Sequence, residues 1–193
     1  MGVGVIVGIV IGVVLLLLVV WLFVTYNRLV RLRNLTKNAW AQIDVQLKRR
    51  HDLIPNLVET VKGYAGHERQ TLEAVTQARN TAVGAVGKGV GEQAKAEGRL
   101  SGALSRLLAV AEQYPNLKAN QNFLALQEEL ASTENKISFS RQHYNDSVLN
   151  YNNKIQVAPS NIIADIFGFK TGEFFEVVAP AEREAPKVSF SKN

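Results

Sequence analysis

The sequence predicts an all-α protein: an N-terminal transmembrane helix followed by an antiparallel, up-and-down four-helix bundle. An uninterrupted apolar run occupies residues 3–24, where nineteen residues are apolar and three are glycine. Apolar residues then recur in steps of three and four over residues 29–61 and 126–155, the spacing of helices packed as in bundles and coiled coils. Only two of the five prolines, Pro55 and Pro115, fall within this helical region.

The composition limits the number of domains and excludes several classes of protein. The chain has 193 residues, a formal charge of +5 and no cysteine, which excludes disulfide scaffolds, thiolate zinc sites and cysteine catalysis. Outside the apolar run, enough hydrophobic residues remain for one modest core. We therefore expect a membrane anchor over residues 1–25, a bundle over 26–157, an apolar segment over 158–178 and a disordered tail over 179–193.

The apolar run is long enough to cross the roughly 30 Å hydrocarbon core of a bilayer, which needs about 20 helical residues. No Lys or Arg precedes it and no small-residue cleavage site follows, so we expect an uncleaved anchor and not a signal peptide. The cations that follow the run are Arg28, Arg31, Arg33 and Lys37. By the positive-inside rule they place the N-terminus outside and the bundle in the cytoplasm, with these side chains at anionic lipid headgroups.

Three glycines of the anchor, Gly4, Gly8 and Gly12, recur every fourth residue. Such a stripe of small residues lets two helices approach closely in lipid, which indicates a homo-oligomer. The alternative is that glycine is simply common in membrane helices.

Turn-forming residues divide the bundle. Glycines near residues 63–66 and 84–91, and the Tyr114-Pro115-Asn116 sequence, separate the helices, with Asn116 as a candidate N-cap. The expected helices cover residues 28–63, 67–87, 91–114 and 117–156.

Pro55 falls inside the first of these helices, which we expect to be continuous with the anchor and kinked there. A chain reversal at Asp52 would join a helix of about 35 Å to one of about 54 Å, and the second would overshoot into the membrane.

Polar and aromatic residues in the first and last bundle helices share one register. If these helices are antiparallel, facing residues have a nearly constant sum of residue numbers. The sums are 185 for Asp44 with Arg141, 184 for Arg50 with Glu134, and 184 for Trp40 with Tyr144. We expect two ion pairs beside an aromatic contact, which set the register more than they add stability. The alternative is that each charge faces water alone.

The segment after the bundle is strongly apolar, and Ser160 is a candidate cap for a short helix in it. Its large side chains either cover the open end of the bundle or form a patch that docks on a membrane surface or a partner protein. They are Ile162, Ile163, Ile166, Phe167, Phe169, Phe174 and Phe175.

The sequence carries no recognisable catalytic motif. The glycines near Lys88 lack the spacing of a phosphate-binding loop. A metal site built from His51, Asp44 or Glu134 is conceivable, but no Glu-x-x-His pair occurs, so we expect no metal and no other cofactor. We expect no nucleic-acid binding either, because the basic cluster lies beside the anchor and the Lys48-Arg49-Arg50 run is short.

Several segments resemble the LemA family of bacterial proteins, across residues 26–175. They are Tyr26-Asn27, Ala39-Trp40, residues 44–50, residues 52–58, Val61-Lys62-Gly63-Tyr64, His67-Glu68, Thr133-Glu134-Asn135, Tyr144-Asn145, Tyr151-Asn152, Phe167-Gly168-Phe169 and Phe174-Phe175. The resemblance implies an N-terminal anchor and an antiparallel helical bundle, and no established activity. A magnetosome-membrane protein also resembles this family, which favours a role in membrane organisation.

We therefore expect a non-enzymatic, self-associating scaffold or adaptor in the bacterial inner membrane, with the lipid bilayer as its partner and a membrane protein as a further candidate partner. The alternative is an accessory factor of a membrane enzyme such as a protease, or a cryptic enzyme with its site in the bundle. A deep polar pocket would favour the alternative, and a filled core would favour the scaffold.

Overall fold

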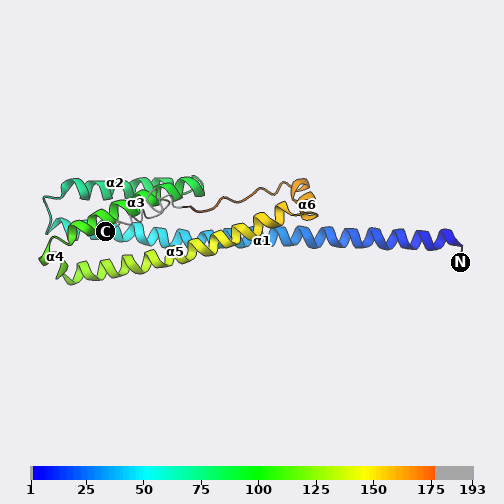
Figure 1. Ribbon diagram of the computed structural model, residues 1–193, viewed down its shortest axis with the longest axis horizontal. Helices are drawn as coiled ribbons and strands as arrows, with labels where there is room; N and C mark the ends of the chain where they lie inside the picture. The colour runs from blue at the N-terminus through cyan, green and yellow to red at the C-terminus, as the bar shows by residue number, and fades with distance from the viewer. Residues whose placement is uncertain (1, 177–193) are drawn as a thin grey trace, which may run out of the picture. The chain divides into compact units, whose positions relative to one another are not determined.

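The computed structural model describes residues 2–176, and the regular elements of this part are helices without a strand (Figure 1). The helices are α1 (Val3–Lys62), α2 (Arg69–Ala85), α3 (Val90–Ala111), α4 (Pro115–Lys118), α5 (Gln121–Gln156) and α6 (Ser160–Ile166). The chain forms two compact units. Unit 1 comprises Met1–Val45 and Ser138–Glu173, and unit 2 comprises Gln46–Ile137 and the chain from Phe174 onward. The tail predicted to be disordered, residues 179–193, lies outside the described residues.

A single helix, α1, joins the apolar run to the first predicted bundle helix. The most apolar stretch of α1, 18 residues long and called the apolar window below, has no buried residue, and the helix is long and apolar enough to cross a membrane. Pro55 lies inside α1 and does not end it; the kink expected there stays a prediction. Because proline lacks an N–H, the carbonyl oxygen of His51 loses its partner within the helix. Arg79 of α2 replaces that partner, donating from Nε to His51 O at 3.2 Å.

Unit 1 is built where α1, α5 and α6 pack together. Its buried cluster contains residues from all three helices and from the chain after α6: Leu29, Tyr151, Ile155, Ile163, Ala164 and Phe169. Asn152 fastens the chain that follows α6, because its Nδ2 donates to Gly172 O at 3.0 Å and its Oδ1 accepts from Gly172 N at 2.8 Å. This reciprocal pair keeps the segment after α6 against α5.

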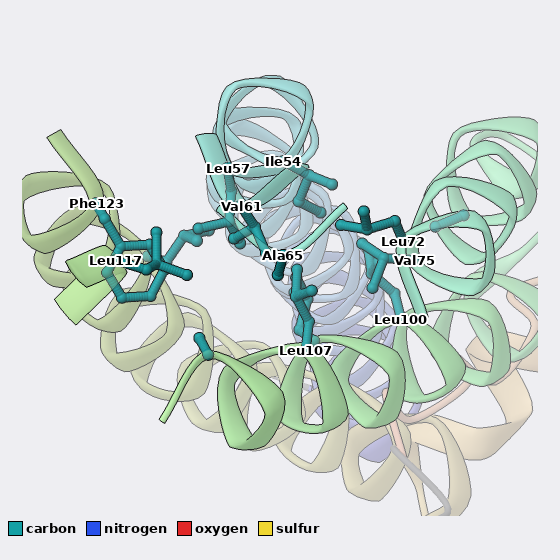
Figure 2. Close-up of a cluster of buried hydrophobic side chains, with 14 of the residues drawn as sticks. Ile54, Leu57, Val61, Ala65, Leu72, Val75, Leu100, Leu107, Leu117 and Phe123 are labelled. Atoms are coloured by element: carbon teal, nitrogen blue, oxygen red, sulfur yellow. The ribbon is translucent and has the colours of Figure 1, made fainter. Parts of the chain in front are cut away.

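Unit 2 has the larger core, drawn from α1 through α5. Figure 2 shows Ile54, Leu57 and Val61 of α1 between two groups of side chains. Leu72, Val75 and Leu100 of α2 and α3 lie on one side, and Leu117 and Phe123 lie on the other. The 3–4 spacing of the α1 residues places them on one face of the helix, which explains their common burial.

The predicted caps differ from those observed. Asn116 lies inside α4, a four-residue helix that begins at Pro115, and Asn120 caps α5 by accepting from Phe123 N at 3.0 Å. Proline suits the first turn of a helix, so Pro115 starts one of its own. Ser160 was also a wrong prediction as a cap, because its hydroxyl donates backward to the carbonyl oxygens of Lys154 and Val157.

Candidate functional site

Unit 2 holds a buried group of charged side chains, here called the Arg50 cluster: Arg50, His51, Glu97, Ser101 and Glu134. Arg50, His51 and Glu97 are 2%, 4% and 1% exposed. Arg50 Nη2 donates to Glu97 Oε2, and His51 Nε2 lies 2.7 Å from Glu97 Oε1. Arg50 Nη1 donates to Glu134 Oε2 at 2.6 Å and to Ser101 Oγ at 3.1 Å. Two carboxylates from different helices thus share one guanidinium.

The helical positions of these residues direct them inward. Arg50 stands three residues after Leu47 and four before Ile54, both fully buried on α1. Glu97 stands three residues before Leu100, which is also fully buried. Residues three and four apart share a helix face, so both charges occupy core-facing positions and must find partners there.

Sequence reasoning reached only part of this cluster. The structure brings together Arg50 and Glu134, the pair found from the sum of residue numbers. The same reasoning missed Glu97, the more deeply buried partner of Arg50. A signal was present, because Gln93 and Glu97 interrupt the apolar seam that continues through Leu100.

The electrostatics of the cluster keep Glu97 ionised at neutral pH. Burial alone raises the pKa of its carboxyl, but the hydrogen bond with His51 and the positive charge of Arg50 outweigh burial and lower the pKa below its ordinary value. His51 Nε2 therefore donates to this carboxylate. Arg50 Nε has no hydrogen-bond partner among the described residues, so the cluster carries a cost of desolvation.

The Arg50 cluster contains groups used in acid–base catalysis, but its geometry isolates them. The histidine, the guanidinium and the Glu97 carboxylate are closed off from solvent, whereas the Glu134 side chain is 55% exposed and Ser101 is half-buried. Within residues 2–176, no three His, Asp or Glu side chains gather as a metal site would require. The arrangement is suited to fixing how α1, α3 and α5 pack.

Unit 1 holds a second group, here called the Tyr26 cluster: Tyr26 and Arg33 of α1 with Phe167 and Phe169 after α6. The Tyr26 ring lies 4.8 Å from the Phe167 ring and 5.9 Å from the Phe169 ring, centroid to centroid. The Arg33 guanidinium carbon lies 5.2 Å from the Phe169 centroid, within cation–π range. Two residues after the apolar run, α1 is thus covered by aromatic rings.

The end of α6 explains the alternation of the two phenylalanines. Gly168 has a φ of +66°, which glycine adopts without strain. Gly168 N donates to Asp165 O at 3.2 Å and Phe169 N donates to Ala164 O at 2.9 Å, the two bonds of a Schellman motif. The turn leaves Phe167 half-exposed, at 50%, and buries Phe169 to 8%.

The structure divides the predicted apolar docking residues into two groups. Ile163, Phe169 and Phe175 are buried. The exposed group consists of Ile162, Ile166, Phe167 and Phe174. Some side chains of the segment thus complete a core and others remain on the surface, and docking on a membrane or a partner protein stays a prediction.

Other predicted residues lie as follows. Trp40 and Tyr144 pack edge to face, with ring centroids 5.2 Å apart. Asp44 and Arg141 are each half-buried in unit 1, and their ion pair stays a prediction. The predicted headgroup contacts are exposed on α1: Arg28, Arg31, Arg33 and Lys37. A side chain added at Gly4, Gly8 or Gly12 would meet no atom within 4 Å.

Comparison with known proteins gives a family match and several relatives. The LemA family profile matches residues 39–190. Two magnetosome proteins of Paramagnetospirillum magneticum, MamQ 1 and MamQ 2, are each 28% identical over 80% of this chain and 66% of their own length. Protein LemA of Metamycoplasma hominis is 30% identical over 72% of this chain and 63% of its own length. The chain thus spans just under two thirds of these relatives.

Proposed function

This chain belongs to the LemA family, and from that premise we propose that it is a membrane-anchored helical scaffold or adaptor that associates with copies of itself. In this proposal it crosses the bacterial inner membrane once, with its N-terminus outside, and presents an antiparallel helical bundle to the cytoplasm. Its work is to organise membrane or partner proteins and not to catalyse a reaction. The relatives named for the magnetosome are in keeping with such a role.

The observation that carries the proposal is the continuity of α1. The same helix supplies the apolar window, which no protein atom buries, and the packing surface of unit 1 around Leu29. Unit 1 is therefore attached to its anchor without a flexible linker. Such a direct connection suits a protein whose task is to hold a structure at a fixed place beside a bilayer.

The nature of the polar interior also favours a scaffold over an enzyme. A catalytic His–carboxylate pair must reach a substrate, whereas His51 and Glu97 are sealed in the core with Arg50. Buried ionic groups that interlock between helices are best known for specifying register and packing. The Arg50 cluster is thus better suited to holding the fold than to chemistry.

Self-association is proposed through the glycine stripe. Gly4, Gly8 and Gly12 leave one side of the apolar window without side chains, and space remains around each. A second copy of the same helix can approach closely along such a stripe.

The test is the mass and shape of the full-length protein in detergent, by light scattering after gel filtration and by electron microscopy. We expect a ring, cage or filament of several copies. Gly8→Ile should shift the population toward the monomer, whereas Val10→Ile, which adds bulk on another side of the helix, should not. A wild-type protein that stays monomeric at every concentration contradicts the scaffold, and equal assemblies from both variants contradict the glycine interface.

An accessory role beside a membrane enzyme such as a protease, or a cryptic active site, is the alternative. An open groove of about 1170 Å³ in unit 2 favours partner binding, because it is lined by residues of α1, α2 and the turn between them, among them Val58, Lys62, His67 and Leu72. If a membrane enzyme co-purifies and Lys62→Glu does not weaken that co-purification, the contact lies outside the groove.

A further inference from the structure

The short helix α6 carries large apolar side chains on its solvent side. Ile162 is 56% exposed and Ile166 is 69% exposed, and Phe167 follows directly at 50%. The opposite side of α6 packs into the protein, because Ile163 and Ala164 are buried in the core of unit 1. A helix this short does not need extra apolar residues to pack, so the exposed ones require another explanation.

The position of α6 along α1 explains why these apolar side chains are exposed. The cluster that contains Ile163 and Phe169 packs against Leu22, Tyr26, Val30 and Leu32 of α1, and the Phe167 ring at the end of α6 lies 4.8 Å from the Tyr26 ring. Leu22 belongs to the apolar run that ends at Val24, and Tyr26 lies just beyond it. The rise of an α-helix separates Leu22 from Tyr26 by about 6 Å, so α6 lies beside the end of the run. In Figure 1, α1 continues past α6 toward the N-terminus.

The length of the apolar run indicates at which depth of a bilayer Leu22 and Tyr26 lie. Residues 3–24 form about 33 Å of helix, and the hydrocarbon core of a bilayer is about 30 Å thick. The last residues of the run therefore lie at the boundary between acyl chains and headgroups. Side chains that pack against Leu22 and Tyr26 lie at the same depth.

The exposed arc of α6 is itself divided. At 100° per residue, Ile162 and Ile166 lie within about 40° of each other, and Asn161 and Asp165 lie within about 40° of each other on the neighbouring part of the arc. One edge is thus apolar and the other is polar. This is the pattern of a helix that rests in the boundary with its apolar edge toward the acyl chains.

The charged groups nearby suit the same location. Arg28 and Arg31 are exposed on the turns of α1 that follow Tyr26, and Lys170 is exposed after Phe169. Arg33 is held over the Phe169 ring. Cations beside an apolar patch are the usual combination at an anionic membrane surface, because the apolar groups enter the boundary while the cations remain among phosphates.

We propose that α6 and Phe167 form a second membrane contact, seated in the polar–apolar boundary of the bilayer that α1 crosses. This inference rests on the membrane anchoring in the proposed function. It assigns a role to Ile162, Ile166 and Phe167 that packing within unit 1 does not. A second protein chain is the weaker occupant, since three side chains expose far less than the roughly 800 Å² per partner of a stable interface.

The absence of cysteine makes the proposal directly testable. Single cysteines at Ile162→Cys and Ile166→Cys are labelled with an environment-sensitive fluorophore in the full chain, which is reconstituted into vesicles of phosphatidylcholine and phosphatidylglycerol. Leu16→Cys, in the middle of the anchor, is the positive control. Phe139→Cys is the aqueous control, because Phe139 is 75% exposed. The level of Phe139 along the unit supports this choice. Phe139 precedes Tyr144 by five residues on α5, and Trp40, which packs on Tyr144, lies about 24 Å along α1 from Val24.

Quenching by lipids that carry a nitroxide near the headgroup is then measured at 139, 162 and 166, and quenching by lipids that carry a nitroxide deep on the acyl chain is measured at 16. We expect the labels at 162 and 166 to be quenched at least about three times as strongly as the label at 139, because helices in the boundary lie about 5–10 Å deep. Labels at 162 and 166 that match 139 while the label at 16 is quenched overturn the boundary contact and leave the anchor intact. An unquenched label at 16 overturns both the anchor and the inference. Energy transfer between labels on two chains, without lipid quenching, identifies a protein interface and also overturns the inference.

Discussion

In unit 2 a guanidinium, an imidazole and a carboxylate lie in the interior, whereas in unit 1 two isoleucine side chains of α6 and the Phe167 ring that follows it lie on the surface. Each arrangement departs from the rule that apolar groups are buried and charges are solvated. The charges of the Arg50 cluster pair with one another, since Arg50 Nη1 lies 2.6 Å from Glu134 Oε2 and His51 Nε2 lies 2.7 Å from Glu97 Oε1. Ile162 and Ile166 are exposed within residues 2–176, and they belong to a helix that packs beside the end of an apolar run.

The two departures differ in where the compensating groups lie. For the buried charges these groups lie within the fold, and for the exposed apolar side chains they lie outside it. A buried ion pair contributes little net stability, yet removing one partner is costly because the other charge stays buried. An exposed apolar side chain contributes little to folding, yet it can dominate binding to a lipid or protein surface. Variants in the Arg50 cluster should therefore affect unfolding, and variants at the α6 surface should affect location.

The largest expected effect is that of Glu97→Ala. The substitution leaves Arg50 and His51 buried without their shared carboxylate, and such losses cost about 3–5 kcal/mol. Urea unfolding of the detergent-solubilised chain, followed by far-ultraviolet circular dichroism, measures this difference.

The matched control is Glu129→Ala, which removes the partner of Arg49 on the surface, where both side chains are well exposed. Exposed ion pairs are worth about 0–1 kcal/mol, so this variant should remain close to wild type. If Glu97→Ala were no less stable than Glu129→Ala, the Arg50 cluster would have no structural role.

A second pair of variants makes the same comparison inside the Tyr26 cluster. Phe169→Ala empties a buried site and removes the ring beneath Arg33, and such truncations cost about 3 kcal/mol or more. Phe167→Ala removes a half-exposed ring and should cost about 1 kcal/mol or less. Thermal unfolding in detergent ranks the two. Equal losses would mean that Phe167 is a core residue, and its assignment to a surface contact would fail.

How much of this could be predicted from the sequence depends on whether the information is local. The apolar run, the helical spacing and the contact of Trp40 with Tyr144 follow from periodicity and from one assumed register. Glu97 was missed because its contact with Arg50 depends on how α3 is rotated against α1 after two intervening turns, which no spacing within either helix specifies. The cap at Asn120 was missed because Pro115 starts a helix of only four residues.

The candidate membrane contact shows the same limit. Ile162 and Ile163 are adjacent and identical in type, yet one is 56% exposed and the other 2% exposed. Composition indicated an apolar patch without showing which side chains would remain on the surface. That division follows from which side of α6 packs into the core of unit 1, which is a property of the packed structure.

The smallest expected effect concerns a buried polar group in unit 1, the hydroxyl of Tyr144, which donates to Glu173 O at 2.8 Å. Burial, followed by the negative charge of Glu173, raises the pKa of Tyr144 to about 12 from an ordinary value of 10.0. The folded state therefore keeps this proton at pH values where the unfolded state releases it, and stability falls as the pH rises from about 10 through 12. At about 1.4 kcal/mol per pKa unit, the loss is at most about 3 kcal/mol. Unfolding free energies of wild type and Tyr144→Phe, compared at pH 9 and near pH 12, should converge by up to that amount, because phenylalanine has no proton to lose. Curves that stay parallel would show that the Tyr144 hydroxyl is solvated in the folded state. Tyr144 would then not be a buried polar group like those of the Arg50 cluster.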